Sequence, residues 1–155
     1  RMEARKEIIY REMERVVQCS LVWQKILAPV KGVGPRIAAG LIGIIGDIRR
    51  FPSWRALVRY AGYGVEVVNG EARMQRLRRG QWAGFNVDLQ QTTWLLTQQI
   101  LKQNSEPWKT LYLKNKEKHL ASGCPKNHAH RKALRYVGKC FLRWLWREWT
   151  ALYAD

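Results

Sequence analysis

The sequence has few cysteines, few acidic residues and no long hydrophobic run. Three cysteines among 155 residues are an odd number at irregular spacings, which disfavours a disulfide framework and indicates reduced thiols in the cytoplasm. The longest apolar run, Ile37 to Ile45, contains two glycines and is about half as long as a transmembrane helix. The first 30 residues also lack the charged and then apolar order of a signal peptide. We therefore expect no membrane partner.

The shortage of acidic residues gives the protein a strong positive charge. Asp and Glu number 12 against 28 Lys and Arg, so the formal net charge is +16. Because 46% of the residues are hydrophobic and eight are Trp, this charge does not belong to a disordered tail. A folded domain with such an excess of cations is suited to an acidic polymer, and nucleic acid is the natural partner.

Hydrophobic spacing predicts a mainly α-helical protein with one short β-hairpin. We expect a helix that Lys31 to Arg36 open and Gly46-Asp47 close, and further helices over about 54–60, 86–103, 107–120 and 127–153. Ser53 is suited to the N-cap of the helix over 54–60, and Ala61-Gly62 to its left-handed stop. Asn69-Gly70, between Val65 and Met74, is a strong signal for a tight hairpin turn. We divide the chain into a helical connector or coiled coil over 1–28 and a helix-hairpin-helix domain over 29–155.

The N-terminal segment is expected to be a single helix over 1–27, because it contains no Gly or Pro. Its apolar residues recur at heptad-like spacings, which are typical of a coiled coil. Two interpretations stay open: the helix forms a homo-oligomer or a connector to an upstream domain, or it packs on its own domain. The residues at the heptad positions are Met2, Ile9, Met13, Val16, Trp23 and Leu27.

The segment from Val30 to Ala39 matches the helix-hairpin-helix pattern. In this pattern glycines allow a tight turn whose N–H groups, at the start of a helix, are directed at a DNA phosphate. Such a contact positions the protein on DNA without distinguishing bases. An ordinary turn between two helices is the alternative. The residues that we expect to contact phosphate are Lys31, Gly32, Val33, Gly34 and Arg36.

Two further basic clusters lack acidic neighbours, and we expect both to contact phosphates. The first follows the predicted hairpin and comprises Arg73, Arg76, Arg78 and Arg79. The second lies on one face of the last helix, because positions four apart stay on one side of a helix, and comprises Arg131, Arg135, Lys139 and Arg143. Tyr136 and Trp146 project into the same sector, where aromatic rings could stack on bases. A solvated basic face is the alternative.

The candidate metal ligands and catalytic groups form no recognisable set. Cys124, His128 and His130 have a spacing that matches none of the usual zinc patterns. The carboxylates between Asp47 and Asp88 are not grouped as two-metal chemistry requires. We therefore predict no metal site, and the residues themselves indicate no nucleophile.

Three blocks of the sequence closely resemble the C-terminal domain of the insertion-sequence transposases of the IS116/IS110/IS902 type, some of which are guided by a bridge RNA. The blocks are Lys31 to Gly34 with Ala38-Ala39, Ile45 to Ser53, and Tyr60 to Gly62. The segment from His128 to Trp146 is similar to the end of a subset of these proteins. The resemblance therefore covers nearly the whole chain.

This resemblance implies a prokaryotic DNA recombinase that acts in the cytoplasm on the nucleoid. It also implies an acidic, Mg²⁺-dependent, resolvase-like nuclease domain upstream of a fragment that begins with Arg1, so no cofactor is expected in the fragment itself. In the family, a serine that precedes a glycine shortly after Tyr-Ala-Gly is the proposed nucleophile. This sequence has Asn69-Gly70 at that place, and an amide is no nucleophile. We therefore assign no catalytic residue.

The sequence thus predicts the DNA-binding and assembly domain of an insertion-sequence transposase. Its expected partners are DNA, a guide RNA in guided members, and a second copy of the chain through the N-terminal helix. Two alternatives stay open: a non-catalytic helix-hairpin-helix module for duplex or branched DNA, and a basic scaffold for an acidic protein. Whether this part acts as an enzyme is also left open.

Overall fold

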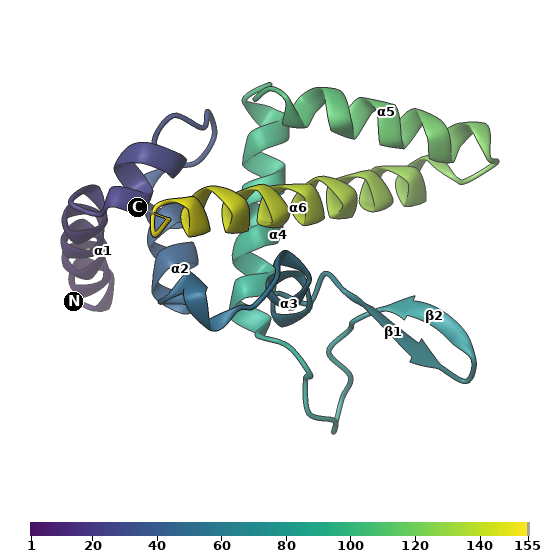
Figure 1. Cartoon of the computed structure of the whole chain (residues 1–155), viewed down its shortest axis with the longest axis horizontal. Coiled ribbons are helices and arrows are strands. Elements are labelled where there is room, and N and C mark those ends of the chain that lie inside the picture. Colours follow the sequence, from purple (N-terminus) through teal and green to yellow (C-terminus); the bar gives the residue numbers. More distant parts are fainter. Residues whose placement is uncertain (155) are drawn as a thin grey trace.

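The computed structural model describes residues 1–154, and these residues form a mainly helical protein with one two-stranded antiparallel sheet (Figure 1). The prediction of a mainly α-helical fold with one hairpin is confirmed. The elements are α1 (Met2–Gln18), the π-helix η1 (Trp23–Leu27), α2 (Pro35–Ile45), the 3-10 helix η2 (Ile48–Arg50), α3 (Trp54–Tyr60), β1 (Val65–Val68), β2 (Glu71–Met74), α4 (Val87–Lys102), α5 (Trp108–Ala121) and α6 (Lys126–Ala151).

The long helix α6 lies at the centre of the fold, and the other helices pack around it. α5 runs back along α6, α4 crosses behind it, and α3 contacts it from below in the view of Figure 1. The face of α6 that includes Val137, Phe141 and Leu145 is fully buried. Each such side chain contributes about 1.5–3 kcal/mol on burial. The charged face of α6 is consequently left on the outside.

Local signals in the sequence set the boundaries of several elements. The Ser53 hydroxyl accepts a hydrogen bond from the Ala56 N–H at the start of α3, and the Asn86 side chain accepts one from the Leu89 N–H at the start of α4. In the hairpin, Val68 pairs with Glu71 across Asn69 and Gly70, whose φ angles are +52° and +80°. Two consecutive positive φ angles are what a two-residue hairpin turn requires. The predictions of the Ser53 cap and of the Asn69-Gly70 turn are confirmed.

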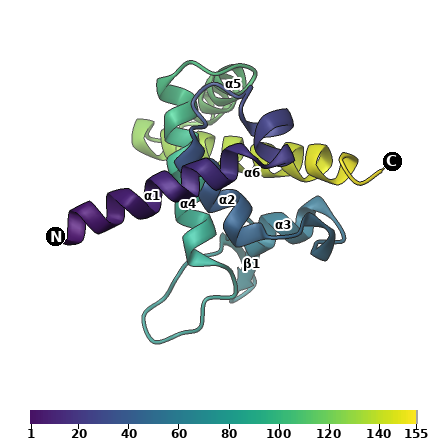
Figure 2. The ribbon, with the colours of Figure 1, turned by 90° about the vertical axis from the view of Figure 1, so that its left-hand side faces the viewer.

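The prediction of one uninterrupted helix over 1–27 is wrong. α1 ends at Gln18, and the Ser20 hydroxyl then accepts a hydrogen bond from the Val22 N–H, which turns the chain. The chain continues as η1, in which Leu27 is fully buried. Burial of this side chain in the core, rather than on a helix seam, explains the break. Figure 2 shows α1 running from the free N-terminus across α2.

The three cysteines are free thiols, as the sequence predicts. Across residues 1–154, no helix combines the length and the apolar character that a membrane span needs. The hairpin of β1 and β2 extends from the helical body in Figure 1, and most of its residues are exposed. The two ends of the hairpin are joined at its base by a hydrogen bond from the Gly64 N–H to the Gln75 side-chain oxygen, at 3.0 Å.

Candidate nucleic-acid interface

The glycine turn between η1 and α2 has one residue with a left-handed backbone. Gly32 has a φ of +97°, and a Cβ atom there would lie 3.0 Å from the Gln99 carbonyl oxygen of α4. Gly34 has an extended backbone, caps α2 and faces open space. Val33 is buried and its N–H donates to the Val30 carbonyl, whereas Lys31 is exposed. The open approach to this turn is therefore at Gly34 and the start of α2.

The cation beside this turn, Arg36, is held by α1. Its Nε donates to Glu14 at 2.8 Å, a terminal nitrogen lies 3.4 Å from Glu7, and its guanidinium lies 4.7 Å from the centre of the Tyr10 ring. The hydrogen bond to Glu14 is the main cause of a raised pKa of Arg36. Because two carboxylates lie beside the turn, α1 opposes the approach of a phosphate there.

A second basic region is formed where α3 packs on α6. The guanidinium of Arg55, from α3, lies 4.6 Å from the centre of the Trp54 ring, and that of Arg143, from α6, lies 4.9 Å from the same ring. Arg59 follows Arg55 by one turn and Lys139 precedes Arg143 by one turn, so each pair shares a helix face. We call this region, comprising Arg55, Arg59, Lys139 and Arg143, the α3–α6 surface.

The α3–α6 surface has no acidic counterpart within residues 1–154. The ion pairs of this part of the chain involve other cations. Sequence analysis missed Arg55 and Arg59, although a signal was present, since no acidic residue occurs between Asp47 and Glu66. Four uncompensated cations on two adjoining helices can attract the phosphates of a nucleic-acid backbone.

Arg135, one of the predicted contacts on α6, is bound within the protein. It donates to the carbonyl oxygens of Gly64 at 2.9 Å and Gly62 at 3.5 Å, and its guanidinium lies 5.3 Å from the centre of the Tyr63 ring. Burial lowers the pKa of Arg135. This arginine therefore ties the turn after α3 to α6, while Arg131, one turn earlier on α6, is exposed.

The two aromatic residues predicted to face nucleic acid differ in their surroundings. Trp146 is half-buried, and its indole N–H donates to the Phe51 carbonyl oxygen at 3.0 Å. That donor fastens α6 to the segment before α3. Tyr136 is 41% exposed, so its ring is accessible at the surface.

The arginines after the hairpin form two groups. Arg73 pairs with Glu71 at 3.3 Å, and Arg78 pairs with Glu66 at 3.0 Å. The Arg73–Glu71 pair is exposed, and such pairs contribute about 0–1 kcal/mol, so a phosphate can displace its carboxylate, whereas the Arg78–Glu66 pair is half-buried. Arg76 and Arg79 are exposed and lie outside these ion pairs.

Within residues 1–154, no group of three or more His, Cys, Asp or Glu side chains is arranged to hold a metal ion. His130 instead lies against α5, where its Nδ1 is 2.6 Å from the Tyr112 hydroxyl oxygen. Burial is the main cause of a lowered pKa of His130, and Lys116 and Arg131 add to the effect. This histidine thus joins the two long helices of the α5–α6 pair.

Comparison with known families gives the class of the protein. Residues 24–112, somewhat more than half of the chain, match the profile of the Transposase IS116/IS110/IS902 family. The match runs from η1 through the glycine turn, α3 and the hairpin into α5. The chain belongs to this transposase family, as the sequence motifs predict. No curated protein and no solved structure matches it.

Proposed function

We propose that this chain is the DNA-binding and assembly domain of an insertion-sequence transposase. Membership of the transposase family supports a role in DNA transposition. The observation that carries the binding role is the α3–α6 surface, whose four cations come from two helices in contact and have no ion-pair partner among residues 1–154. Arg55 and Arg143 are both stacked on Trp54, which fixes their guanidinium groups at the surface.

In this proposal the protein holds the sugar-phosphate backbone and does not read bases at this surface. Lys31 and the amides at the start of α2 add a second phosphate contact, in the manner of a helix-hairpin-helix turn. The exposed cations beyond the hairpin, Arg76 and Arg79, add a third. All three contacts recognise phosphate, so they serve DNA and a guide RNA alike.

A purely binding role for this part of the chain is the second candidate, and the hairpin favours it. Asn69 stands at the exposed tip of the hairpin with a φ of +52°, at the place where the resemblance implies a serine nucleophile. A side-chain amide cannot attack a phosphodiester, and the turn itself explains why Asn-Gly is found there. The transposase role and the binding role predict the same affinity for nucleic acid, and they differ in strand cleavage.

The proposal is tested by measuring how DNA affinity depends on salt. We expect the purified chain to bind a labelled 30-base-pair duplex, with an affinity that falls by about 0.9 log units per log unit of salt for each phosphate neutralised. Arg55→Met and Arg143→Met each keep the apolar stem and remove the charge. Each variant should lower the affinity and reduce the salt slope by about 1.

The matched control is Arg5→Met, which removes the same charge from an exposed position on α1. It should leave the salt slope unchanged. Absence of binding in dilute buffer would overturn the proposal. An equal loss for all three variants would show that only the net charge matters and that the α3–α6 surface has no special role.

A further inference from the structure

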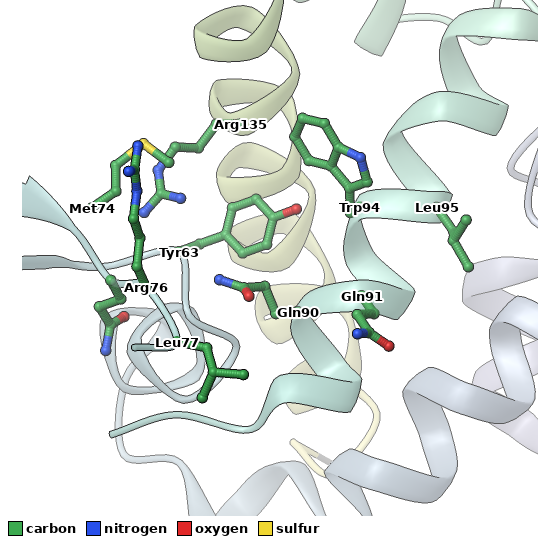
Figure 3. Close-up of a pocket in the computed structure, with 10 residues that line it drawn as sticks. Tyr63, Met74, Arg76, Leu77, Gln90, Gln91, Trp94, Leu95 and Arg135 are labelled. Atoms are coloured by element: carbon green, nitrogen blue, oxygen red, sulfur yellow. The ribbon is translucent and has the colours of Figure 1, made fainter. Parts of the chain in front are cut away.

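A cavity of about 600 Å³ lies between the base of the hairpin and the helices α4 and α6. Tyr63 and Arg76 line it on the hairpin side, Gln90, Gln91 and Trp94 line it from α4, and Arg135 lines it from α6. Figure 3 shows Tyr63, Gln90 and Trp94 converging on one space, while Arg76 and Arg135 lie close to each other. Segments that are far apart in the sequence thus line one cavity, and none of its lining residues belongs to the α3–α6 surface.

The lining of this cavity combines aromatic rings, amides and cations. Trp94 supplies a flat apolar surface, Tyr63 is almost wholly buried in the wall, and Gln91, which is exposed at the rim, carries both a donor and an acceptor. Among residues 1–154, two guanidinium groups and no carboxylate line the cavity. A ligand that matches this lining has a planar, hydrogen-bonding ring and a negative charge.

One polar atom of the cavity wall lacks a partner. The Tyr63 side chain is only 2% exposed, and its hydroxyl has no hydrogen-bond partner in the described structure. Nearby, the Gln90 amide donates to the Gly62 carbonyl at 3.1 Å, which holds this side chain in the wall. A buried hydroxyl without a partner is unfavourable unless a ligand or water completes it.

We propose that this cavity binds one unpaired nucleotide, with the base against Trp94 and the phosphate at Arg76 and Arg135. The inference rests on the proposed function, because it takes the nucleotide from a nucleic acid that the α3–α6 surface holds. The cavity then gives the domain a preference for distorted or junction-containing nucleic acid over regular duplex.

Whether a base is already unpaired determines how tightly the cavity binds the nucleic acid that contains it. Removing a base from a regular duplex costs both pairing and stacking, whereas a bulged, mismatched or single-stranded base has already lost one or both. Stacking on an aromatic ring tolerates any base, and only the amides add selectivity. We therefore expect the cavity to distinguish unpaired from paired positions more strongly than it distinguishes one base from another.

The experiment uses a duplex with a single bulged 2-aminopurine and the same duplex fully paired. We expect the bulged duplex to bind at least about fivefold more tightly and the 2-aminopurine emission to fall on binding, because the base stacks on an aromatic side chain. Gln91→Ala and Trp94→Leu should lower the preference toward onefold and restore the emission. Their melting temperatures show whether each variant remains folded, and Gln91→Ala at an exposed position keeps the test valid if Trp94→Leu does not fold.

Two matched controls separate the cavity from the general basic surface. Gln98→Ala changes an exposed glutamine of α4 that lies outside the cavity, and it should keep both the preference and the quenching. Arg76→Ala should lower the preference, whereas Arg79→Ala, from the same segment but outside the cavity, should weaken both duplexes equally.

The outcomes distinguish this inference from the proposed function. Equal affinity for the bulged and paired duplexes, with unchanged emission, would overturn the cavity as a base site and leave DNA binding by the α3–α6 surface intact. Absence of binding to either duplex would overturn both. Deoxyadenosine monophosphate can then be added at millimolar concentration as a competitor. Recovery of the 2-aminopurine emission would support a site that also binds a free nucleotide. Persistent quenching would support a site that requires the neighbouring phosphates of the strand.

Discussion

The two glycines of the turn before α2 have different structural tasks. Gly32 has a left-handed backbone and packs against α4, so a side chain there is strained and crowded. Gly34 has an extended backbone that any residue before a proline can adopt. A Cβ atom at Gly34 meets no other atom within 4 Å. The fold therefore does not require the absence of a side chain at Gly34.

Substitution of each glycine separates these tasks. Gly32→Ala should lower the free energy of unfolding by about 1–3 kcal/mol, because it forces a left-handed backbone on alanine. Gly34→Val should change it by less than about 1 kcal/mol and weaken DNA binding by blocking the approach to the α2 amides. Thermal unfolding and fluorescence anisotropy measure the two effects. Wild-type affinity in Gly34→Val would remove the turn from the interface.

Arg135 and Arg131 offer a second contrast at the scale of single residues. Arg135→Met removes the donors that the Gly62 and Gly64 carbonyls use, and it should lower the free energy of unfolding by about 1.5–3 kcal/mol. Arg131→Met, at an exposed position on the same helix, should change stability by less than about 0.5 kcal/mol. Urea unfolding of both variants tests this. Equal stability would mean that the contact of Arg135 with the turn is unimportant.

The burial of His130 should make the stability of the protein depend on pH. Burial lowers the pKa of His130 in the folded protein, so the unfolded chain takes up a proton first as the pH falls below about 6.5. Stability from this residue should be complete above that pH and decline as the pH falls toward the folded pKa. His130→Asn should remove this part of the pH dependence, measured as the melting temperature at pH 7.5 and 5.5. If the melting temperature of the variant differs between the two pH values as much as that of the wild type, the assignment to His130 is contradicted.

At the scale of whole elements, α1 covers the cation of the glycine turn. Its Glu7 and Glu14 occupy Arg36, the side chain that would otherwise face a phosphate. α1 is joined to the rest of the domain by a short segment around Ser20 and packs on α2. We propose that a helix attached in this way covers one of the three proposed phosphate contacts with its carboxylates.

Neutralising the acidic side of α1 should therefore strengthen DNA binding. We expect Glu7→Gln with Glu14→Gln to raise duplex affinity several-fold at low salt, because Arg36 is freed and two negative charges are removed. The control is Glu3→Gln with Glu12→Gln, which makes the same change of charge on α1 away from Arg36. If both pairs raise the affinity equally, the effect is one of net charge and not of Arg36.

The sequence predicted elements whose boundaries depend on neighbouring residues, such as the Ser53 cap and the Asn69-Gly70 turn. It did not predict the break after Gln18, because neither Gly nor Pro stands there and the break combines the Ser20–Val22 hydrogen bond with the burial of Leu27 in the core. The same limit applies to the interface. Arg135 has the spacing of a surface residue on α6, and only the position of the turn after α3 shows that it is bound inside.

At the scale of the whole molecule, an apolar face of α1 has no partner within residues 1–154. Met2, Ile9 and Val16, at three of the heptad positions, are 78%, 58% and 67% exposed. The heptad pattern does not continue beyond the break, since Leu27 is fully buried. We propose that this face pairs with α1 of a second copy, which would place two basic surfaces in one assembly.

Assembly through α1 is tested by measuring mass in solution. Wild-type protein should have the mass of a dimer by light scattering at micromolar concentration, because exposed apolar heptad positions favour helix pairing. The double variant Ile9→Asp with Val16→Asp should be monomeric, and the melting temperature of the helices outside α1 should be unchanged. The control Arg5→Asp with Arg15→Asp places the same side chains at exposed polar positions of α1, and it should stay dimeric. Wild-type monomers would contradict the proposal.

The contacts of Arg55 and Arg143 with Trp54 affect the rate and the affinity with which the surface can bind a polyanion. Both guanidinium groups lie over one indole, 4.6 Å and 4.9 Å from the ring centre, and this contact restricts their rotation in the unbound protein. Ordering a long side chain on association otherwise costs about 0.5–1.5 kcal/mol. Lysine at either position would keep the charge but lacks the planar guanidinium that packs on the ring. The preorganisation of the side chain for binding would therefore be lost.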